Sequence, residues 1–174
     1  MNQREFLIQH IIEGKKLAIL TEESGIARSQ FAKWYETGGK TLDSIRRANK
    51  LFASRTNNNQ FDEFKNLGRR RFFEWYESQP KECYYCGIEE YKLEQLFDYD
   101  TGILQTKRGR GRSLELERKD AKNNTYTIEN CVLACYLCNN HKSDLITDSE
   151  HKKYFVKQFR AFQEDKFQEM NAGR

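Results

Sequence analysis

Two pairs of cysteines constrain this chain more than any other feature. The stretch "CYYC" carries Cys83 and Cys86, and "CYLC" carries Cys135 and Cys138 about fifty residues later. Each C-x-x-C turn lets two thiolates bind one ion at about 2.3 Å, and two such turns complete a tetrahedron. The spacing therefore predicts a four-cysteine zinc site that joins two parts of the chain. A closed shell of four thiolates leaves no position for water, so we expect a structural zinc, whereas a redox dithiol would need one pair.

The composition agrees with a small, metal-supported core. Hydrophobic residues make up 37% of the 174 residues and charged residues 32%, so a metal would compensate for limited apolar burial. The fifth cysteine, Cys131, is expected to be a small buried hydrophobe. No apolar run approaches the roughly eighteen residues of a membrane span, and the N-terminus "MNQREFLIQH" is polar. We therefore expect a cytoplasmic protein without a membrane partner.

Basic residues are concentrated in the first third of the chain. Residues 1–60 contain 10 Lys and Arg against 6 Asp and Glu, while the remainder is balanced. The two densest clusters are "GRRR" at 68–71 and "KRGRGR" at 107–112. Such clusters are typical of phosphate contacts or of solvated faces, and composition does not separate the two.

Residues 1–58 are predicted to form a helical module, and "RTNNNQ" at 55–60 is the expected linker. Within the module, "LAILTEESGIARSQFAKWYE" predicts two short helices hinged on Gly25 and resembles a helix-turn-helix. The DNA-reading face would then carry Arg28, Gln30 and Lys33. The alternative is a small helical bundle that serves as an interaction surface.

Residues 61–174 are predicted to form a second domain with two short strands. A helix broken near Gly68 comes first, followed by the first cysteine pair and a helix at "EEYKLEQLF". "SLELE" alternates as a half-buried strand does, and "CVLAC" predicts a second strand that leads into a helix at about Tyr136. Thr147 and Glu150 form a capping box that opens a last helix, whose phenylalanines face one side for core or dimer packing. These are Phe155, Phe159 and Phe162.

The stretches "LELERKD" and "IENCVLACYLCNNHKSD" together resemble the HNH, ββα-metal or His-Me finger, nuclease family. With "FFEWYESQPKECYYCGI" they look most similar to the zinc-stapled, PacI-like restriction endonucleases. The resemblance covers about residues 71–148 and implies an α+β fold. In that fold a mostly helical chain would hold a zinc-stapled ββα-metal core at 81–148, beside the N-terminal module.

The resemblance also implies an active site at the end of the first strand. Glu117 matches the acidic ligand of a catalytic Mg²⁺ or Mn²⁺, and Asn139 matches the helix residue that completes its coordination. Asn130 matches the asparagine that buttresses the loop. Arg118 stands where most of the family has histidine, and a guanidinium is a poor general base.

Other groups must then move the proton. Arg118 would orient water or clamp the phosphate, with Tyr126 or His141 supplying or relaying the proton. His141 could equally be a solvated helix residue. Lys142 would contact a backbone phosphate or a carbonyl. The basic loop is placed to hold DNA through Arg108, Arg110 and Arg112.

The function implied is a metal-dependent endonuclease that hydrolyses double-stranded DNA, in a restriction role, encoded by a bacterium or phage. A homodimer would supply the two active sites needed to cut both strands. One alternative is a zinc-containing DNA-binding regulator with a decayed nuclease site, marked by Arg118. Another is a homing or RNA-directed HNH nuclease.

Overall fold

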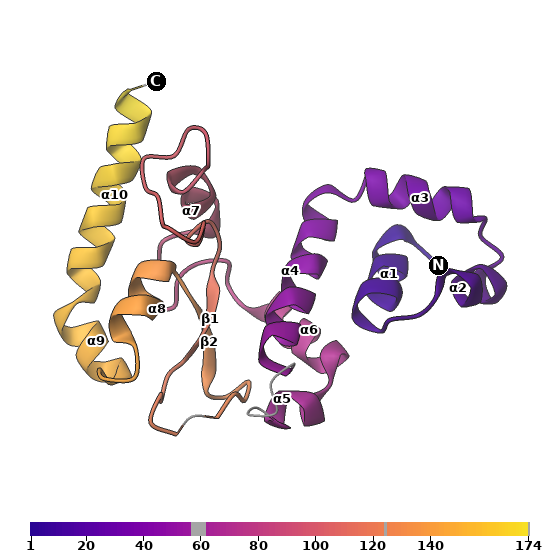
Figure 1. The fold of residues 1–174 in the computed structure, drawn as a ribbon, viewed down its shortest axis with the longest axis horizontal. Coiled ribbons are helices and arrows are strands. Elements are labelled where there is room, and N and C mark those ends of the chain that lie inside the picture. The colour runs from indigo at the N-terminus through magenta and orange to yellow at the C-terminus, as the bar shows by residue number, and fades with distance from the viewer. Residues whose placement is uncertain (57–61, 124, 174) are drawn as a thin grey trace. The chain divides into compact units, whose positions relative to one another are not determined.

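The computed structural model describes residues 1–56, 62–123 and 125–173. The chain divides into two compact units, Met1–Ser78 and Gln79–Arg174. The fold is mostly helical, with one two-stranded sheet in the second unit (Figure 1). Among the described residues, no helix combines the length and the apolar character that crossing a membrane requires.

The first unit contains helices joined by short turns and, over its described residues, no strand. Its elements are α1 (Gln3–Leu7), η1 (Ile8–Ile12), α2 (Leu17–Ser24), α3 (Arg28–Glu36), α4 (Gly39–Thr56), α5 (Asp62–Leu67) and α6 (Arg69–Ser78). One part of its core is aromatic, because the Phe6 and Phe31 rings stack with centroids 4.2 Å apart and both are buried. This stacking packs α1 on α3.

The predicted pair of short helices around Gly25 is present as α2 and α3. Gly25 ends α2 in the left-handed region at φ 68°, a conformation that glycine adopts without steric cost. Leu20 and Phe31 are buried, while Leu17 and Trp34 are half-buried. The helices and the turn agree with the pattern, but their use as a helix-turn-helix stays a proposal.

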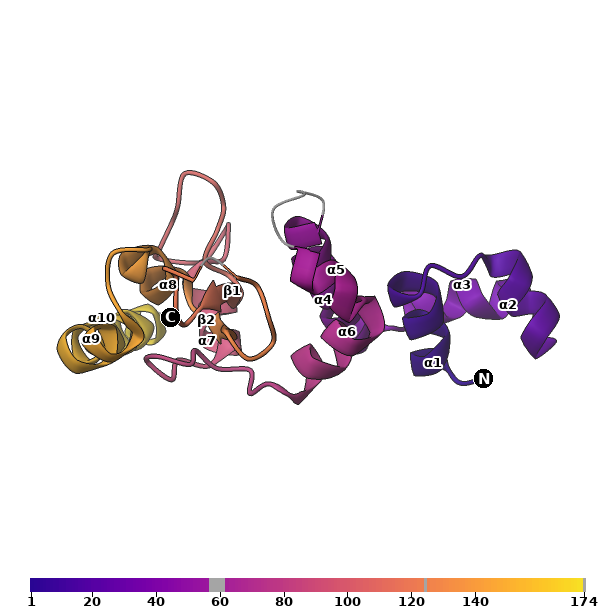
Figure 2. The ribbon, with the colours of Figure 1, turned by 90° about the horizontal axis from the view of Figure 1, so that it is seen from below.

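The apolar stripe of α4 builds the other part of this core. Leu42, Ile45, Leu51 and Phe52 are buried, as their spacing predicts. Helices α5 and α6 pack against α4 and lie beside it in both ribbon views (Figures 1 and 2). Gly68, at φ 81°, separates α5 from α6, where the sequence predicts a break.

The compact units divide after Ser78, whereas the sequence places its linker at 55–60. The reason is that the helices after the linker supply Phe72, which packs against Phe52 of α4, and Phe64, which packs against Phe72. Most of the expected linker, together with Phe61, lies outside the described residues.

The second unit surrounds a short antiparallel hairpin. Strand β1 (Glu115–Arg118) pairs with β2 (Cys131–Ala134), so that Glu117 lies opposite Val132 and Arg118 opposite Cys131. The helices are α7 (Glu90–Leu96), α8 (Tyr136–Lys142), α9 (Asp148–Tyr154) and α10 (Val156–Ala172). Helix α8 contacts β1 on one side and α10 on the other, and Figure 1 shows it between them. Hairpin and helix form the predicted ββα arrangement.

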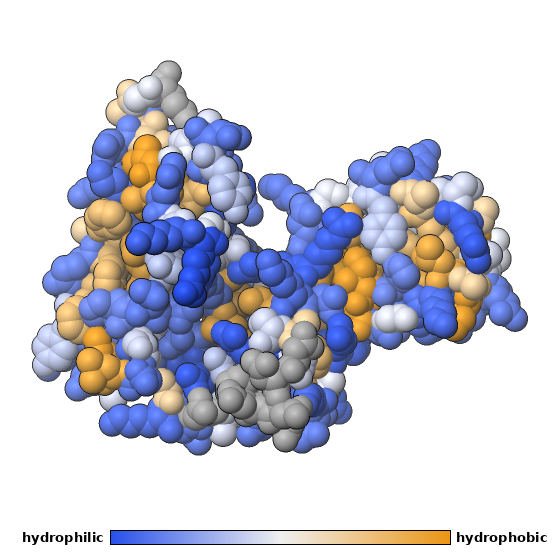
Figure 3. All heavy atoms as spheres, in the orientation of Figure 1, coloured by the Kyte–Doolittle hydropathy of each residue, from blue (hydrophilic) through white to orange (hydrophobic). Residues whose placement is uncertain are grey.

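The C-terminal segment corrects one expectation. The capping box of Thr147 and Glu150 is present, but the single predicted helix is two, because the backbone at Phe155 leaves helical geometry. Phe162 is 41% exposed, and the buried side chains of α10 are Gln163 and Met170. Figure 3 shows hydrophilic residues over most of the visible surface, with apolar residues in separate patches.

Phe72 tests the core of the first unit. Its side chain is fully buried against the rings of Phe52, Phe64 and Trp75. We expect Phe72→Ala to lower the free energy of unfolding of this unit by about 3–5 kcal/mol, through lost burial and a cavity. Urea unfolding followed by circular dichroism measures this. Ile19→Ala, at a side chain 43% exposed, should change it by less than about 0.5 kcal/mol, and equal effects would contradict the assignment.

Candidate functional site

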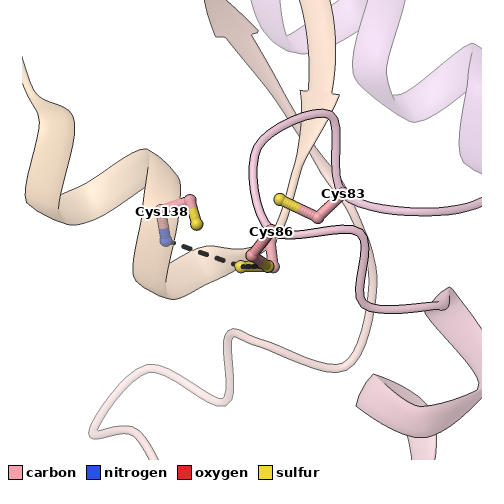
Figure 4. A group of neighbouring side chains, drawn as sticks. Cys83, Cys86 and Cys138 are labelled. Carbon is pink, nitrogen blue, oxygen red and sulfur yellow. Dashed lines mark hydrogen bonds between the residues drawn. The ribbon is translucent and has the colours of Figure 1, made fainter. Parts of the chain in front are cut away.

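The four predicted cysteines meet in one buried cluster. Cys83 and Cys86 belong to a tight turn before α7, closed by a bridge between Glu82 and Glu89. Cys135 caps α8 and Cys138 lies in its first turn. Figure 4 shows the turn and the start of α8 bringing their sulfur atoms toward one another. The four Sγ atoms lie within 4.8 Å of one another.

This cluster has the chemistry of a metal centre. A tetrahedral ion with metal–sulfur distances of about 2.3 Å requires sulfur atoms about 3.8 Å apart, and the Cys86 and Cys135 Sγ atoms are 3.8 Å apart. Hydrogen bonding with Cys135 and burial raise the pKa of Cys86 and of Cys138. Four buried thiolates would therefore repel one another unless a cation compensated their charge. The cluster could bind zinc, and it fits a closed, structural site.

Gln163 is a contributor to this centre that the sequence analysis missed. Its side chain is fully buried on α10, and its Nε2 donates a hydrogen bond to Cys135 Sγ at 3.3 Å. Its Oε1 accepts one from the Cys86 thiol at 3.2 Å. A glutamine in a helix carries no sequence signal of this role. The contact joins α10 to the cysteine cluster through one amide.

The end of β1 carries a buried ion pair. Lys142 Nζ lies 3.0 Å from Glu117 Oε1 and donates a second hydrogen bond to the Arg118 carbonyl at 2.9 Å. Lys142 is completely buried and Glu117 is 8% exposed. Burial raises the pKa of the Glu117 carboxyl, and the Lys142 hydrogen bond opposes that rise. The pair fixes the orientation of Glu117 against α8.

Lys142, which the sequence places among the DNA-contacting residues, is buried in this structure. A fully buried ammonium has no surface to offer a phosphate, because α8 packs it against the hairpin. The sequence predicts that Lys142 contacts either a backbone phosphate or a carbonyl, and the structure contains the contact with the Arg118 carbonyl. Removing either partner of a buried ion pair typically costs about 3–5 kcal/mol, because the remaining charge is left uncompensated.

Asn139 faces Glu115 instead of making a contact with Glu117. Its Nδ2 donates to Glu115 Oε2 at 2.7 Å. The same carboxylate accepts two hydrogen bonds from Arg110, from Nε at 2.9 Å and Nη2 at 2.5 Å. Glu115 and Glu117 are two residues apart on one strand, so both project on the face that α8 covers. Glu115 thus links the basic loop to α8.

Arg118 lies beside Tyr126, which the sequence proposed as one proton donor. The guanidinium carbon is 4.9 Å from the centre of the Tyr126 ring, and that tyrosine is 7% exposed. His141, the other proposed donor, is exposed and packs among aromatic rings of α9 and α10. Its ring centroid is 4.4 Å from that of Phe155 and 4.9 Å from that of Phe159. The structure thus pairs Arg118 with Tyr126 and turns His141 toward the C-terminal helices.

Asn130 holds the loop between the two strands. Its Oδ1 accepts from the Asp120 backbone amide at 2.9 Å, and its Nδ2 donates to the carbonyls of Asp120 and Thr125 at 3.1 and 3.0 Å. These bonds tie the beginning and the middle of the loop to the residue before β2. Next to this loop lies an open cavity of about 450 Å³. It is lined by residues 119–122 and by Asp144, Ile146, Thr147, Asp148 and Ser149.

The basic loop is folded onto aromatic residues. Arg110 lies over the Tyr136 ring at 4.9 Å, and Arg112 lies over Tyr99 at 5.1 Å and pairs with Asp98 at 3.1 Å. Arg108 is exposed. Gly111, at φ 112°, allows the close approach, because a Cβ there would lie 2.6 Å from the Phe97 ring.

In the first unit, the predicted reading face of α3 is largely on the surface. Arg28 and Lys33 are exposed and Gln30 is half-buried.

Oxygen donors for a catalytic divalent ion are present at β1. Among the described residues, the cysteines form the one group of three or more His, Cys, Asp or Glu side chains close enough to hold an ion. A hard cation at Glu117 and Asn139 would therefore complete its shell with water and phosphate oxygens, as Mg²⁺ commonly does. The oxygen chemistry fits such an ion, although Glu117 Oε1 is already engaged by Lys142.

Comparison with known proteins returns one similar solved structure. No family model matches the chain, and no curated protein matches it. The solved structure is described as "An extraordinary mechanism of DNA perturbation exhibited by the rare-cutting HNH restriction endonuclease PacI". It is 23% identical, the match covers 71% of this chain and 81% of that chain, and the TM-score is 0.48. This chain is thus similar to a protein of the family that its sequence motifs resemble.

The cysteines give a direct test of the metal centre. We expect the purified protein to retain one zinc per chain, and Cys138→Ala to lose it, because three buried thiolates leave the tetrahedron open. Zinc released on denaturation is measured with a colorimetric chelator. Cys131→Ala removes a buried cysteine outside the cluster and should keep the metal. Equal zinc content in the two variants would contradict the site.

Gln163 gives a second test at the same centre. We expect Gln163→Leu to lower zinc affinity by about tenfold, since loss of a hydrogen bond to a ligand commonly costs about 10–100-fold. Competition with a chelator of known affinity measures the change. Gln168→Leu, at an exposed position of the same helix, is the matched control. Indistinguishable affinities would show that the amide contact does not tune the metal.

Proposed function

We propose that this protein is a metal-dependent endonuclease of the HNH type that hydrolyses phosphodiester bonds in double-stranded DNA. One observation carries the proposal. The hairpin and α8 form a ββα unit in which β1 carries Glu117 and α8 begins at the four-cysteine cluster. This is the arrangement that the sequence motifs imply for a ββα-metal site.

Glu117 and Asn139 are the residues proposed to hold Mg²⁺ or Mn²⁺. When bound, such an ion polarises the scissile phosphate and stabilises the leaving oxygen. Lys142 keeps the Glu117 carboxylate oriented through its ammonium. Glu115 holds the Asn139 amide, so both ligand side chains are fixed before DNA arrives.

Arg118 and Tyr126 are proposed to act on the reacting groups. A guanidinium can clamp a phosphate with two parallel hydrogen bonds and stays charged throughout. The Tyr126 hydroxyl, on the ring beneath that guanidinium, is the proposed proton donor or relay. The ring contacts of His141 make it the weaker candidate for this role.

DNA would reach this site across the basic loop. Arg108 and Arg112 are proposed to contact backbone phosphates. Arg110 would also contact a phosphate while it stays paired with Glu115. In the first unit, α2 and α3 are proposed to act as a helix-turn-helix, with Arg28, Gln30 and Lys33 toward DNA. A homodimer would cut both strands, in the restriction of foreign DNA.

One observation favours a second candidate, a zinc-containing DNA-binding regulator. The carboxylate expected to bind the catalytic ion is already paired with a protein cation, Lys142. Arg118 also replaces the usual histidine base. A regulator would bind DNA without a divalent ion and would not depend on Glu117.

The test is cleavage of unmodified phage DNA with Mg²⁺, with Mn²⁺ or with neither. We expect discrete fragments that require the ion, and a loss of at least about 100-fold in Glu117→Gln, because the ligand charge is removed. Glu129→Gln changes an exposed glutamate near β2 and should cut at the wild-type rate. Each variant must retain its zinc, so that a loss of cleavage reports on chemistry.

Intact DNA in every lane, with binding retained in a gel-shift assay, would reject the nuclease and favour the regulator. Cleavage of RNA but not of DNA would reject double-stranded DNA as the substrate.

A further inference from the structure

Helix α4 gathers much of the basic charge of the first unit. It carries Lys40, Arg46, Arg47, Lys50 and Arg55 against one acidic residue, Asp43. At about 100° per residue, Lys40, Asp43, Arg46, Arg47 and Lys50 fall within about one third of the helix circumference. The buried residues, led by Ile45 and Phe52, occupy the remaining arc. The charge excess of the first third therefore becomes a single basic stripe.

The stripe faces away from the core. Lys40, Arg46 and Lys50 are exposed, and Arg47 is half-buried at the edge of the arc. The guanidinium carbon of Arg46 lies 5.9 Å from the centre of the Tyr35 ring. This contact restricts the movement of the side chain but does not neutralise its charge.

Several other cations of the first unit pair with acidic neighbours. Arg70, within the "GRRR" cluster, pairs with Glu13 at 2.8 Å and Glu74 at 3.0 Å. Lys15 pairs with Glu23 at 2.9 Å and Arg4 with Glu77 at 3.4 Å. In the portion of the chain that the structure describes, no ion pair involves Lys40, Arg46 or Lys50. These three cations lie together on one face of α4, whereas the exposed Lys16, Arg28, Lys33 and Arg71 are spread over other parts of the unit.

The geometry of the stripe suits a nucleic-acid backbone. Ten residues of helix separate Lys40 from Lys50, so the stripe extends about 15 Å. One DNA strand presents a phosphate about every 3.4 Å of helix axis, and long flexible side chains on such a stripe can reach several of them. The stripe has no acidic residue except Asp43 and no large apolar side chain. It therefore lacks the apolar centre that a protein–protein interface usually has.

We propose that the exposed face of α4, defined by Lys40, Arg46 and Lys50, is a phosphate-binding surface for duplex DNA. The inference rests on DNA being the substrate and adds a third contact region to the two in the proposed function. It gives the first unit a role that does not depend on base reading by α3: α4 holds the backbone and raises affinity without sequence preference.

The experiment measures binding of the full-length protein to a short duplex by fluorescence anisotropy, without divalent ions, over a series of salt concentrations. The test variant is Lys40→Gln, Arg46→Gln, Lys50→Gln. We expect the slope of log affinity against log salt to decrease in magnitude by about 2 to 3, at about 0.9 per lost phosphate contact. Asp43→Asn, which removes the one acidic residue of the stripe, should tighten binding.

The matched control removes the same number of charges elsewhere in the unit, as Lys16→Gln, Lys65→Gln, Arg71→Gln. These side chains are exposed and lie outside α4, so the slope should stay at the wild-type value. Circular dichroism must show all variants folded, as expected for exposed positions.

An unchanged slope in the α4 variant would overturn the inference and leave α4 as a solvated face. An equal decrease in the control would also overturn it, because the effect would then follow net charge alone. If the wild type binds and cuts DNA while the α4 variant matches it, the inference fails and the proposed nuclease stands. If the wild type binds no DNA, both fail.

Discussion

The convergence of four buried sulfur atoms is the constraint on which the second unit depends. The sheet is one hairpin with four residues in each strand, too short to be stable alone. The cysteine cluster ties the turn before α7 to the N-terminus of α8, and Gln163 adds α10 through its amide. Three segments far apart in sequence thus meet at one point. Because four clustered thiolates repel one another, a cation there would contribute directly to the folding free energy.

The position of α8 set by this cluster also decides the chemistry at β1. With its first turn held at the cysteines, α8 lies along the strand and presents Asn139 to Glu115 and Lys142 to Glu117. A buried lysine is costly unless its charge is compensated, so this contact is not a passive surface pairing. It can orient a metal ligand, or it can replace the metal by supplying the positive charge itself. The same geometry therefore supports both the proposed nuclease and the rival regulator, and only metal dependence distinguishes them.

The two units deal with their basic residues differently. In the second unit, Arg110 and Arg112 lie over aromatic rings and pair with acidic residues. DNA would have to compete with these pairings. In the first unit, Lys40, Arg46 and Lys50 of α4 are on the surface, outside ion pairs with described residues. We infer a division of labour in which α4 supplies non-specific attraction and the loop beside β1 aligns the strand to be cut.

The sequence by itself determined the features that depend on local spacing. The two C-x-x-C turns predicted the cluster, alternation predicted β1, the capping box predicted the start of α9, and the stripe of Leu42 and Ile45 predicted the buried face of α4. Tertiary structure alone decided which distant side chains meet. It buried Lys142 against Glu117, turned Asn139 to Glu115, directed His141 to the rings of α9 and α10, and brought Gln163 to the sulfur atoms. The physical reason is that these contacts join residues from different elements. Their partners are fixed by how the helices pack, which no local period in the sequence records.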